Sequence, residues 1–379
     1  MSGLRVRTLR FALVGIIATV LLSGCAWFGA DKPKPVPLEA YSPSIKVDAA
    51  WKARIDNVTF PMAIATPAGA FVVAGDNGEI AAFEADTGRE RWRGSARTRL
   101  AAGVGSDGRF AAVVTRDGDL VAFDAGKQIW KKPLGRNVST APLVAGERVF
   151  VLAVDRTVHA YDAQDGTLLW EISRPGDPLT LAQQSVISAF KNTLLVSQGP
   201  RMAALDPSNG SVKWEVAVAS PRGTNEVERL ADLVAPSARV GDVVCARSFQ
   251  VAVGCLNAER GTLAWSKTVG GTEGVAADAQ LVVAADASDR ISAWKTGNGD
   301  VVWASDKLLH HDLSAPMTLP KAVVFGSSEG LLHFLSRETG ATVLRLPTDG
   351  SPLAVAPVMQ AGTMLVVTRN GGLFAYRAE

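Results

Sequence analysis

The chain has 379 residues, of which 47% are hydrophobic and 20% are charged, as expected for a globular protein with a sizeable core. Its 39 basic and 37 acidic residues nearly balance. Without residues 1–24, which contain three arginines and no acidic residue, the net charge changes from +2 to about −1. A near-neutral chain lacks the concentrated basic surface that phosphate backbones require, so we exclude nucleic acid as a partner.

The N-terminus has the pattern of an export signal. Arg5, Arg7 and Arg10 precede an apolar run at 11–22, which is short for a bilayer span and typical of a signal peptide. The run leads into the sequence LSGC, whose last residue is Cys25. This ending resembles the bacterial lipobox, and the resemblance implies that Cys25 is lipidated as the first residue of the mature protein. An ordinary signal peptide with an incidental cysteine is the alternative.

The residues after Cys25 predict where the protein is held. In the sorting rule that lipoboxes imply, an aspartate in the next position retains a lipoprotein at the inner membrane. Ala26 stands there, which favours the outer membrane, with the protein lipid-anchored on the periplasmic face. Residues 29–45 are rich in proline and polar residues and predict an extended tether. We therefore predict a signal peptide at 1–24, a lipidated cysteine and tether at 25–45, and a folded domain at 46–379.

A repeated unit dominates the rest of the chain. The first copy contains an alternating strand at 80–83, a turn that ends at Gly88, and a second strand that ends near Trp92. Each copy follows a β-branched apolar run, so the period is about 40 residues, with about four strands in each period. This pattern predicts an all-β, eight-bladed β-propeller of four-stranded antiparallel blades. The later copies reach Trp130, Trp170, Trp214, Trp265, Trp303, Leu344 in place of tryptophan, and Arg377, where the last copy stops.

The two ends of the chain complement each other. The final copy lacks its tryptophan strand, whereas Trp51 stands near the start with no repeat unit before it. We predict that the N-terminal strand closes the ring by completing the last blade, and that the tryptophans pack between neighbouring blades. An open solenoid is the alternative, but it would leave this complementarity unexplained.

The repeat resembles the quinoprotein-like, PQQ-type propeller repeat. Within that group the chain resembles the BamB family of lipoproteins, which are subunits of the outer-membrane β-barrel assembly (BAM) complex. The closer match is carried by residues 220–232, 306–316 and 326–333, and the resemblance extends over 22–379. It implies a non-catalytic scaffold that binds the POTRA domains of BamA, works with other BAM subunits, and assists insertion of β-barrel proteins. It leaves open whether unfolded outer-membrane protein clients bind directly.

Two loops of the family contact BamA, and both can be located in this chain. A Leu-Thr-Leu-Arg pattern falls on residues 179–182, where Ala182 replaces the arginine. An Arg-Leu-x-Asp-x-Asp pattern falls on 229–234, where Val234 replaces the second aspartate. These loops lie in the longest intervals between tryptophans, of 44 and 51 residues, compared with 38 to 40 elsewhere. Tolerated insertions are the alternative, but long loops on a rigid scaffold often carry binding sites. The predicted contact residues are Leu179 and Leu181 as an apolar anchor, with Glu226, Glu228, Arg229 and Asp232 as a charged rim.

Several motif matches do not indicate catalytic chemistry. Residues 103–108 fit G-x-G-x-x-G and residues 326–330 fit G-x-S-x-G. Both motifs require a following helix, whereas strand-like sequence follows each match, so we predict turns. His310 and His311 are adjacent and would face opposite sides of a strand, and no acidic cluster accompanies them. We therefore predict no cofactor and no metal site.

Cys245 and Cys255 flank the turn of one predicted hairpin. In an oxidising periplasm they can form a cross-strand disulfide, and two reduced core thiols are the alternative. In both cases the role would be structural.

Two other functions compete with the scaffold. A PQQ-dependent dehydrogenase would carry long insertions, an adjacent Cys-Cys pair and acidic calcium ligands, whereas this chain has no Cys-Cys pair and short blades. An envelope adhesin or peptidoglycan-binding lipoprotein would not associate with a barrel insertase. We predict that the protein is not an enzyme.

Overall fold

A computed structural model describes residues 33–174, 179–221 and 224–378 of the chain. Cys25 and the predicted signal peptide lie outside the described residues. Residues 36–379 form one compact unit, which contains every assigned strand. Within the described residues, regular secondary structure consists of β-strands, and no helix there is long and apolar enough to cross a membrane.

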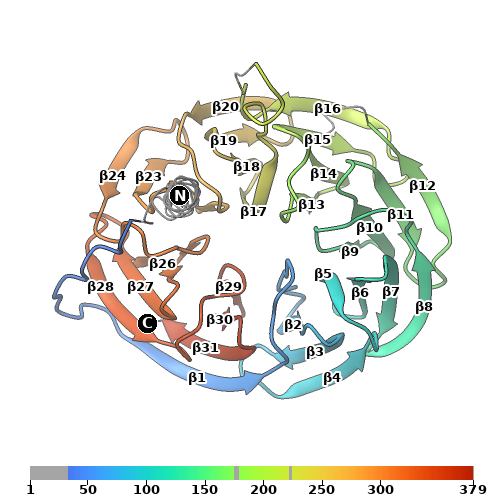
Figure 1. Cartoon of the computed structure of the whole chain (residues 1–379), viewed down its shortest axis with the longest axis horizontal. Coiled ribbons are helices and arrows are strands. Elements are labelled where there is room, and N and C mark those ends of the chain that lie inside the picture. Colours follow the sequence, from blue (N-terminus) through green and yellow to red (C-terminus); the bar gives the residue numbers. More distant parts are fainter. Residues whose placement is uncertain (1–32, 175–178, 222–223, 379) are drawn as a thin grey trace, which may run out of the picture. The chain divides into compact units, whose positions relative to one another are not determined.

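The strands form eight antiparallel sheets that are arranged as blades around an axis (Figure 1). Blade 1 contains β2 (Ala70–Ala74), β3 (Glu79–Glu84) and β4 (Glu90–Ser95). Blade 2 contains β5 (Leu100–Ser106), β6 (Phe110–Thr115), β7 (Asp119–Asp124) and β8 (Lys127–Pro133). Blade 3 contains β9 (Leu143–Ala145), β10 (Arg148–Leu152), β11 (Val158–Asp162) and β12 (Leu168–Ile172). Blade 4 contains β13 (Ile187–Phe190), β14 (Thr193–Gln198), β15 (Arg201–Leu205) and β16 (Val212–Ala217).

The second half of the ring repeats this plan. Blade 5 contains β17 (Leu233–Val240), β18 (Val243–Ser248), β19 (Ala252–Asn257) and β20 (Thr262–Lys267). Blade 6 contains β21 (Ala276–Ala277), β22 (Leu281–Ala285), β23 (Ile291–Lys295) and β24 (Val301–Ser305). Blade 7 contains β25 (Met317–Thr318), β26 (Ala322–Gly326), β27 (Leu331–Ser336) and β28 (Thr342–Pro347). Blade 8 contains β29 (Val358–Gln360), β30 (Thr363–Val367), β31 (Gly372–Ala378) and β1 (Val47–Arg54).

The predicted eight-bladed propeller and its closure are confirmed. β1 pairs with β31 in antiparallel register from Val47 opposite Ala378 to Arg54 opposite Gly372, so strands from both ends of the chain complete blade 8. In blade 1 the sheet has three strands, and a bridge between Ala65 and Val72 lies where the other blades have their inner strand.

The tryptophans pack between blades, as predicted. Seven indoles lie against the turn glycine of the next blade, and the indole N–H often donates to a carbonyl of that turn, as Trp170 does to Pro207 at 3.0 Å. The seven contacts are Trp51–Gly88, Trp92–Gly126, Trp130–Gly166, Trp170–Gly210, Trp214–Gly261, Trp265–Gly299 and Trp303–Gly340.

Blade 7 has Leu344 in place of tryptophan for a structural reason. The next blade is blade 8, whose two outer strands come from opposite ends of the chain, so no glycine turn joins them. Leu344 instead packs in a cluster with Tyr376, Ile45 and Val47.

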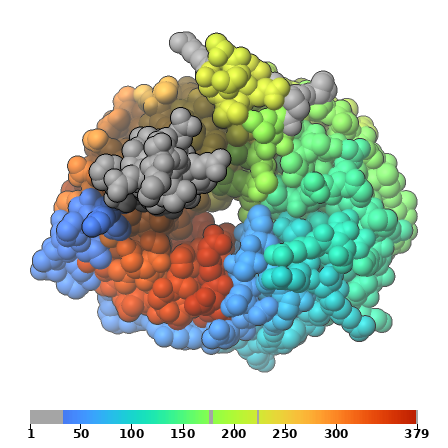
Figure 2. Space-filling view, viewed as in Figure 1, coloured from blue at the N-terminus to red at the C-terminus, as the bar shows by residue number. Residues whose placement is uncertain are grey.

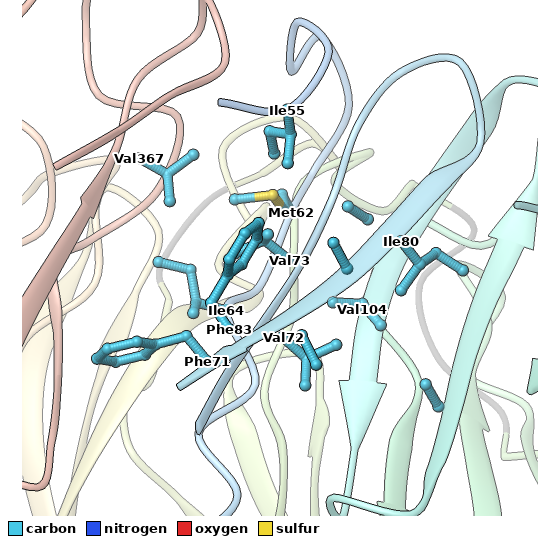
Figure 3. Close-up of a cluster of buried hydrophobic side chains, with 14 of the residues drawn as sticks. Ile55, Met62, Ile64, Phe71, Val72, Val73, Ile80, Phe83, Val104 and Val367 are labelled. Carbon is cyan, nitrogen blue, oxygen red and sulfur yellow. The ribbon is translucent and has the colours of Figure 1, made fainter. Parts of the chain in front are cut away.

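The middle strands are buried on both faces because a neighbouring blade covers each side. Ile80 and Phe83 of β3 are both buried, and so are the two alanines between them, although the sequence pattern predicts alternation. Strands covered on both faces have continuous apolar runs rather than alternating ones. Figure 3 shows one such core, in which Val367 of blade 8, Phe71 of blade 1 and Val104 of blade 2 belong to a single cluster.

Residues 36–45 contact blade 7 and the connection that joins blade 6 to it. The amide of Val36 donates to the carbonyl of Leu309 at 3.1 Å, and the amide of Ser44 donates to the carbonyl of Val343 at 3.0 Å. This part of the predicted tether therefore has defined contacts with the propeller.

Cys245 in β18 lies directly opposite Cys255 in β19, and a disulfide joins them. Both residues are fully buried in a cluster with Trp265 and Trp294. The disulfide therefore links two core strands of blade 5.

Candidate functional site

Two long connections between blades meet on one face of the propeller, which we call the loop face. Residues 173–186 join β12 of blade 3 to β13 of blade 4, and residues 218–232 join β16 of blade 4 to β17 of blade 5. Both run from an outer strand to the next inner strand, so they lie on the same face of the propeller. In Figure 2 the segment that contains residues 224–232 projects in yellow from this face.

A buried carboxylate joins the two connections. Asp232 is only 7% exposed. One of its oxygens accepts the backbone N–H of Leu181 at 2.8 Å, and the other accepts a guanidinium N–H of Arg156 at 3.3 Å. Arg156 belongs to the hairpin between β10 and β11, so this carboxylate links blade 3 to both loops.

The main chain after Leu181 is also held in place. The hydroxyl of Ser139 donates to the carbonyl of Gln183 at 3.0 Å, and the hydroxyl of Thr140 accepts the amide of Ser185 at 3.0 Å. The side-chain amide of Gln183 reaches the carbonyl of Thr272 at 2.8 Å, and the carbonyl of residue 184 accepts an amide from residue 235 at 2.9 Å. The connection between blades 2 and 3, strand β17 of blade 5 and the connection between blades 5 and 6 therefore all hold the main chain of residues 183–185 in place.

The second loop forms a compact turn of its own. The Glu228 carboxylate accepts both the amide of Thr224, at 2.7 Å, and its hydroxyl, at 3.3 Å, while the Glu228 amide donates to the side chain of Asn225 at 2.9 Å. The hydrogen bond from the Thr224 amide is the main cause that lowers the pKa of Glu228. The carboxylate of Glu228 therefore stays ionised while it orders the loop.

The predicted contact residues differ in exposure. Leu179 is 36% exposed, Leu181 and Arg229 are half-buried, and Asp232 is buried. Leu181 and Asp232 are joined directly by the hydrogen bond described above. Glu226 and Glu228 are exposed on the second loop.

Three further positions clarify the family pattern. Ala182 is exposed, so an arginine at this position would reach solvent. Val234 is 1% exposed and lies in β17, so it cannot contact a partner. Val227 is 73% exposed and is absent from the predicted contact residues, although an apolar residue within a charged run was a signal for it.

The loop face opens into the central channel, which is visible in the middle of Figure 2. A cavity of about 640 Å³ is lined there by Ala182, Glu273, Asp289 and Arg369, among others. Burial raises the pKa of the Glu273 and Asp289 carboxyls. In the described part of the chain, no group of three or more His, Cys, Asp and Glu side chains is placed to hold a metal ion.

These features define a β-propeller protein of the PQQ-repeat type with two long connections on one face that a hydrogen bond from Leu181 to Asp232 joins. A family profile described as outer membrane protein assembly factor BamB matches residues 76–305. The protein of that name from Burkholderia pseudomallei is 34% identical over 367 residues, which cover 95% of this chain and 96% of the relative. The chain therefore belongs to the BamB family of outer membrane protein assembly factors.

Solved structures show the same fold. The crystal structure of BamB from Moraxella catarrhalis matches with a TM-score of 0.79 at 20% identity, covering 88% of this chain and 100% of that chain. A quinohemoprotein alcohol dehydrogenase from Pseudomonas putida matches with a TM-score of 0.65 at 14% identity, covering 89% of this chain and 78% of that chain. At these identities the likeness concerns the fold alone.

Proposed function

We propose that this chain is a non-catalytic scaffold of outer-membrane protein assembly that binds the POTRA domains of BamA through the two long connections described above. The membership in the BamB family supports a role in assembly. The observation that carries the proposed contact is Leu179, an exposed leucine on a loop whose main chain is already fixed at residues 181, 183, 184 and 185. A preordered loop loses little conformational entropy on binding.

The surface has the composition of a small interface. Leu179 and Val227 are its exposed apolar side chains, and the exposed Glu226 and Glu228 and the half-buried Arg229 flank Val227 in the sequence of the second loop. Apolar anchors within a polar rim commonly carry most of the binding energy. Because the family's arginine and second aspartate are absent here, we expect the apolar anchor to contribute a larger share of the affinity. Other BAM subunits and unfolded barrel clients are further proposed partners.

The test is affinity capture of the full-length protein from native envelopes. Wild-type protein should recover BamA. Leu179→Ala should lower that recovery about tenfold, because loss of an interface anchor costs more than about 1 kcal/mol. The matched control is Leu263→Ala, since Leu263 is a comparably exposed leucine, at 41%, on the outer strand β20. Undiminished recovery with Leu179→Ala would place the interface elsewhere, and absence of BamA from the wild-type sample would refute the proposed function.

We also propose that Cys25 is lipidated and that the protein faces the periplasm from the outer membrane. The lipobox-like ending and Ala26 support this proposal. Metabolic labelling with a palmitate analogue should mark the wild-type protein in the outer-membrane fraction, whereas Cys25→Ser should lose the label. Label retained by Cys25→Ser would contradict the assignment.

A titration separates the scaffold from the dehydrogenase alternative. We expect no stoichiometric uptake of a pyrroloquinoline quinone in the presence of calcium. Binding of one quinone per chain would instead support an enzyme.

A further inference from the structure

We infer that Arg156 and Asp232 are positioning residues, which hold the Leu179–Leu181 segment in its binding geometry without touching the partner. The inference rests on the proposed function, because it concerns how the same loop face is built. It gives Asp232 a role different from that of a rim residue and adds Arg156, which the sequence pattern does not indicate.

The first argument is burial. The side chains of Arg156 and Asp232 are only 13% and 10% exposed, and their charged atoms lie 3.3 Å apart. A partner could engage the Asp232 carboxylate only if it displaced Arg156 or the Leu181 amide. Separating a buried pair leaves an uncompensated charge, which is strongly unfavourable. The carboxylate is therefore better placed to order the loop than to recognise another protein.

The second argument is that the backbone of Arg156 and of Asp232 is itself held by strands and hydrogen bonds. Arg156 has a left-handed backbone conformation, with φ of +67°, in the tight hairpin between β10 and β11. Its amide donates to the carbonyl of Ala153 at 3.0 Å, and the side chain of Gln198 in β14 donates to its carbonyl at 3.4 Å. Asp232 immediately precedes β17. Arg156 of blade 3 and Asp232 at the start of blade 5 therefore hold the Leu179–Leu181 segment from positions that are themselves fixed.

The third argument is the space beneath the loop. A cavity of about 20 Å³ lies there, lined by Thr140, Arg156, Leu181 and Asp232, among others. This volume has room for about one water molecule. Because the loop does not pack tightly on an apolar core at this point, hydrogen bonds set the position of Leu181.

The substitutions follow from the two bonds that Asp232 makes. Asp232→Ala removes both acceptors, whereas Asp232→Asn keeps an acceptor for the Leu181 amide but loses the charge. Arg156→Met leaves the carboxylate without its cation, whereas Arg156→Lys keeps the charge. We expect Asp232→Ala and Arg156→Met to have large effects, and Asp232→Asn and Arg156→Lys to have smaller ones.

The experiment combines two measurements on the full-length lipidated protein. The first is recovery of BamA from native envelopes, and the second is amide hydrogen exchange of the peptide that contains residues 179–185 in the detergent-purified protein. Asp232→Ala and Arg156→Met should lower recovery about tenfold and should accelerate exchange at the Leu181 amide at least tenfold. Leu179→Ala should lower recovery while leaving that exchange unchanged, because it removes a contact and not a positioning bond.

A matched control tests for general loss of stability. Arg337 and Asp278 form a pair of similar burial, 15% and 25% exposed, at 2.7 Å and away from these loops. Arg337→Met should therefore leave both BamA recovery and exchange at 179–185 unchanged. If Arg337→Met lowered BamA recovery as much as Arg156→Met, the pair of Arg156 and Asp232 would have no special role and the inference would fail.

The remaining outcomes are distinct. If Asp232→Ala abolished recovery with unchanged exchange at 179–185, Asp232 would touch the partner, and the inference would fail while the proposed function stood. If exchange increased but recovery did not fall, the geometry of the loop would be irrelevant to binding, and the inference would also fail. If the wild-type protein recovered no BamA, the proposed function itself would be refuted.

Discussion

The contact between tryptophan and turn glycine makes a testable contribution to stability, and two glycines allow it to be isolated. Gly210 and Gly362 both lie in tight turns with nearly equal φ angles of +74° and +76°. A methyl group at Gly210 would lie 2.7 Å from the Cε3 atom of Trp170, whereas one at Gly362 would meet no atom within 4 Å. The two alanine variants therefore share the backbone strain and differ in the contact between blades.

The expected magnitudes follow from these two contributions. Alanine in the left-handed region costs roughly 1–2 kcal/mol, so Gly362→Ala should lower the free energy of unfolding by about that amount. Gly210→Ala adds overpacking against an indole, which typically costs about 1–3 kcal/mol. The indole cannot move away freely, because its N–H bonds to the carbonyl of Pro207 at 3.0 Å. We therefore expect Gly210→Ala to lose about 2–5 kcal/mol in total.

The assay is urea denaturation followed by far-ultraviolet circular dichroism, with the free energy of unfolding compared among the wild type and the two variants. Near-ultraviolet circular dichroism would also report a displaced Trp170 in Gly210→Ala alone. Equal losses of stability in the two variants would refute the argument that the indole contact is tightly packed.

Three further predictions concern the core and the loop face. Removing the disulfide by Cys245→Ala with Cys255→Ala should lower the free energy of unfolding by about 3 kcal/mol, because the bond closes a loop with a sequence separation of 10, and denaturation under oxidising conditions measures this loss. Burial, aided by the charge of Arg345, lowers the pKa of His333 to about 4, so the neutral side chain contributes stability above pH 6.5 that is lost as the pH falls from 6.5 to 4. The loss is on the order of 3 kcal/mol, and His333→Phe should flatten the measured stability over this range, whereas an unchanged slope would contradict the assignment. Ala182→Arg should raise the affinity for BamA several-fold and make it more sensitive to salt, because position 182 is exposed. Binding titrations at two salt concentrations test this, and an unchanged affinity would show that residue 182 lies outside the interface.

The eight-bladed ring could be predicted from the sequence because each blade is built largely from consecutive residues. The strand, glycine turn and tryptophan of one unit lie within about fifteen residues, as they do from Gly78 to Trp92, so the pattern is local and repeats visibly. Closure by β1 could also be predicted, since Trp51 supplies the strand that the last unit lacks. The sequence shows that Leu344 replaces the tryptophan of the seventh unit. Only the pairing of β1 with β31 shows why no tryptophan is needed there.

The burial of the middle strands and the construction of the loop face could not be predicted in this way. Residues 80–83 are all buried because separate blades cover both faces, which no single repeat reveals. Asp232 is bonded to residues that are 51 and 76 positions earlier in the chain, so its role depends on how three blades are placed around the axis. The sequence by itself thus determined the repeat, the number of blades and the position of the long loops, because these are properties of neighbouring residues. Tertiary structure alone decided which loop residues are exposed and which are internal supports, because burial depends on contacts between distant parts of the ring.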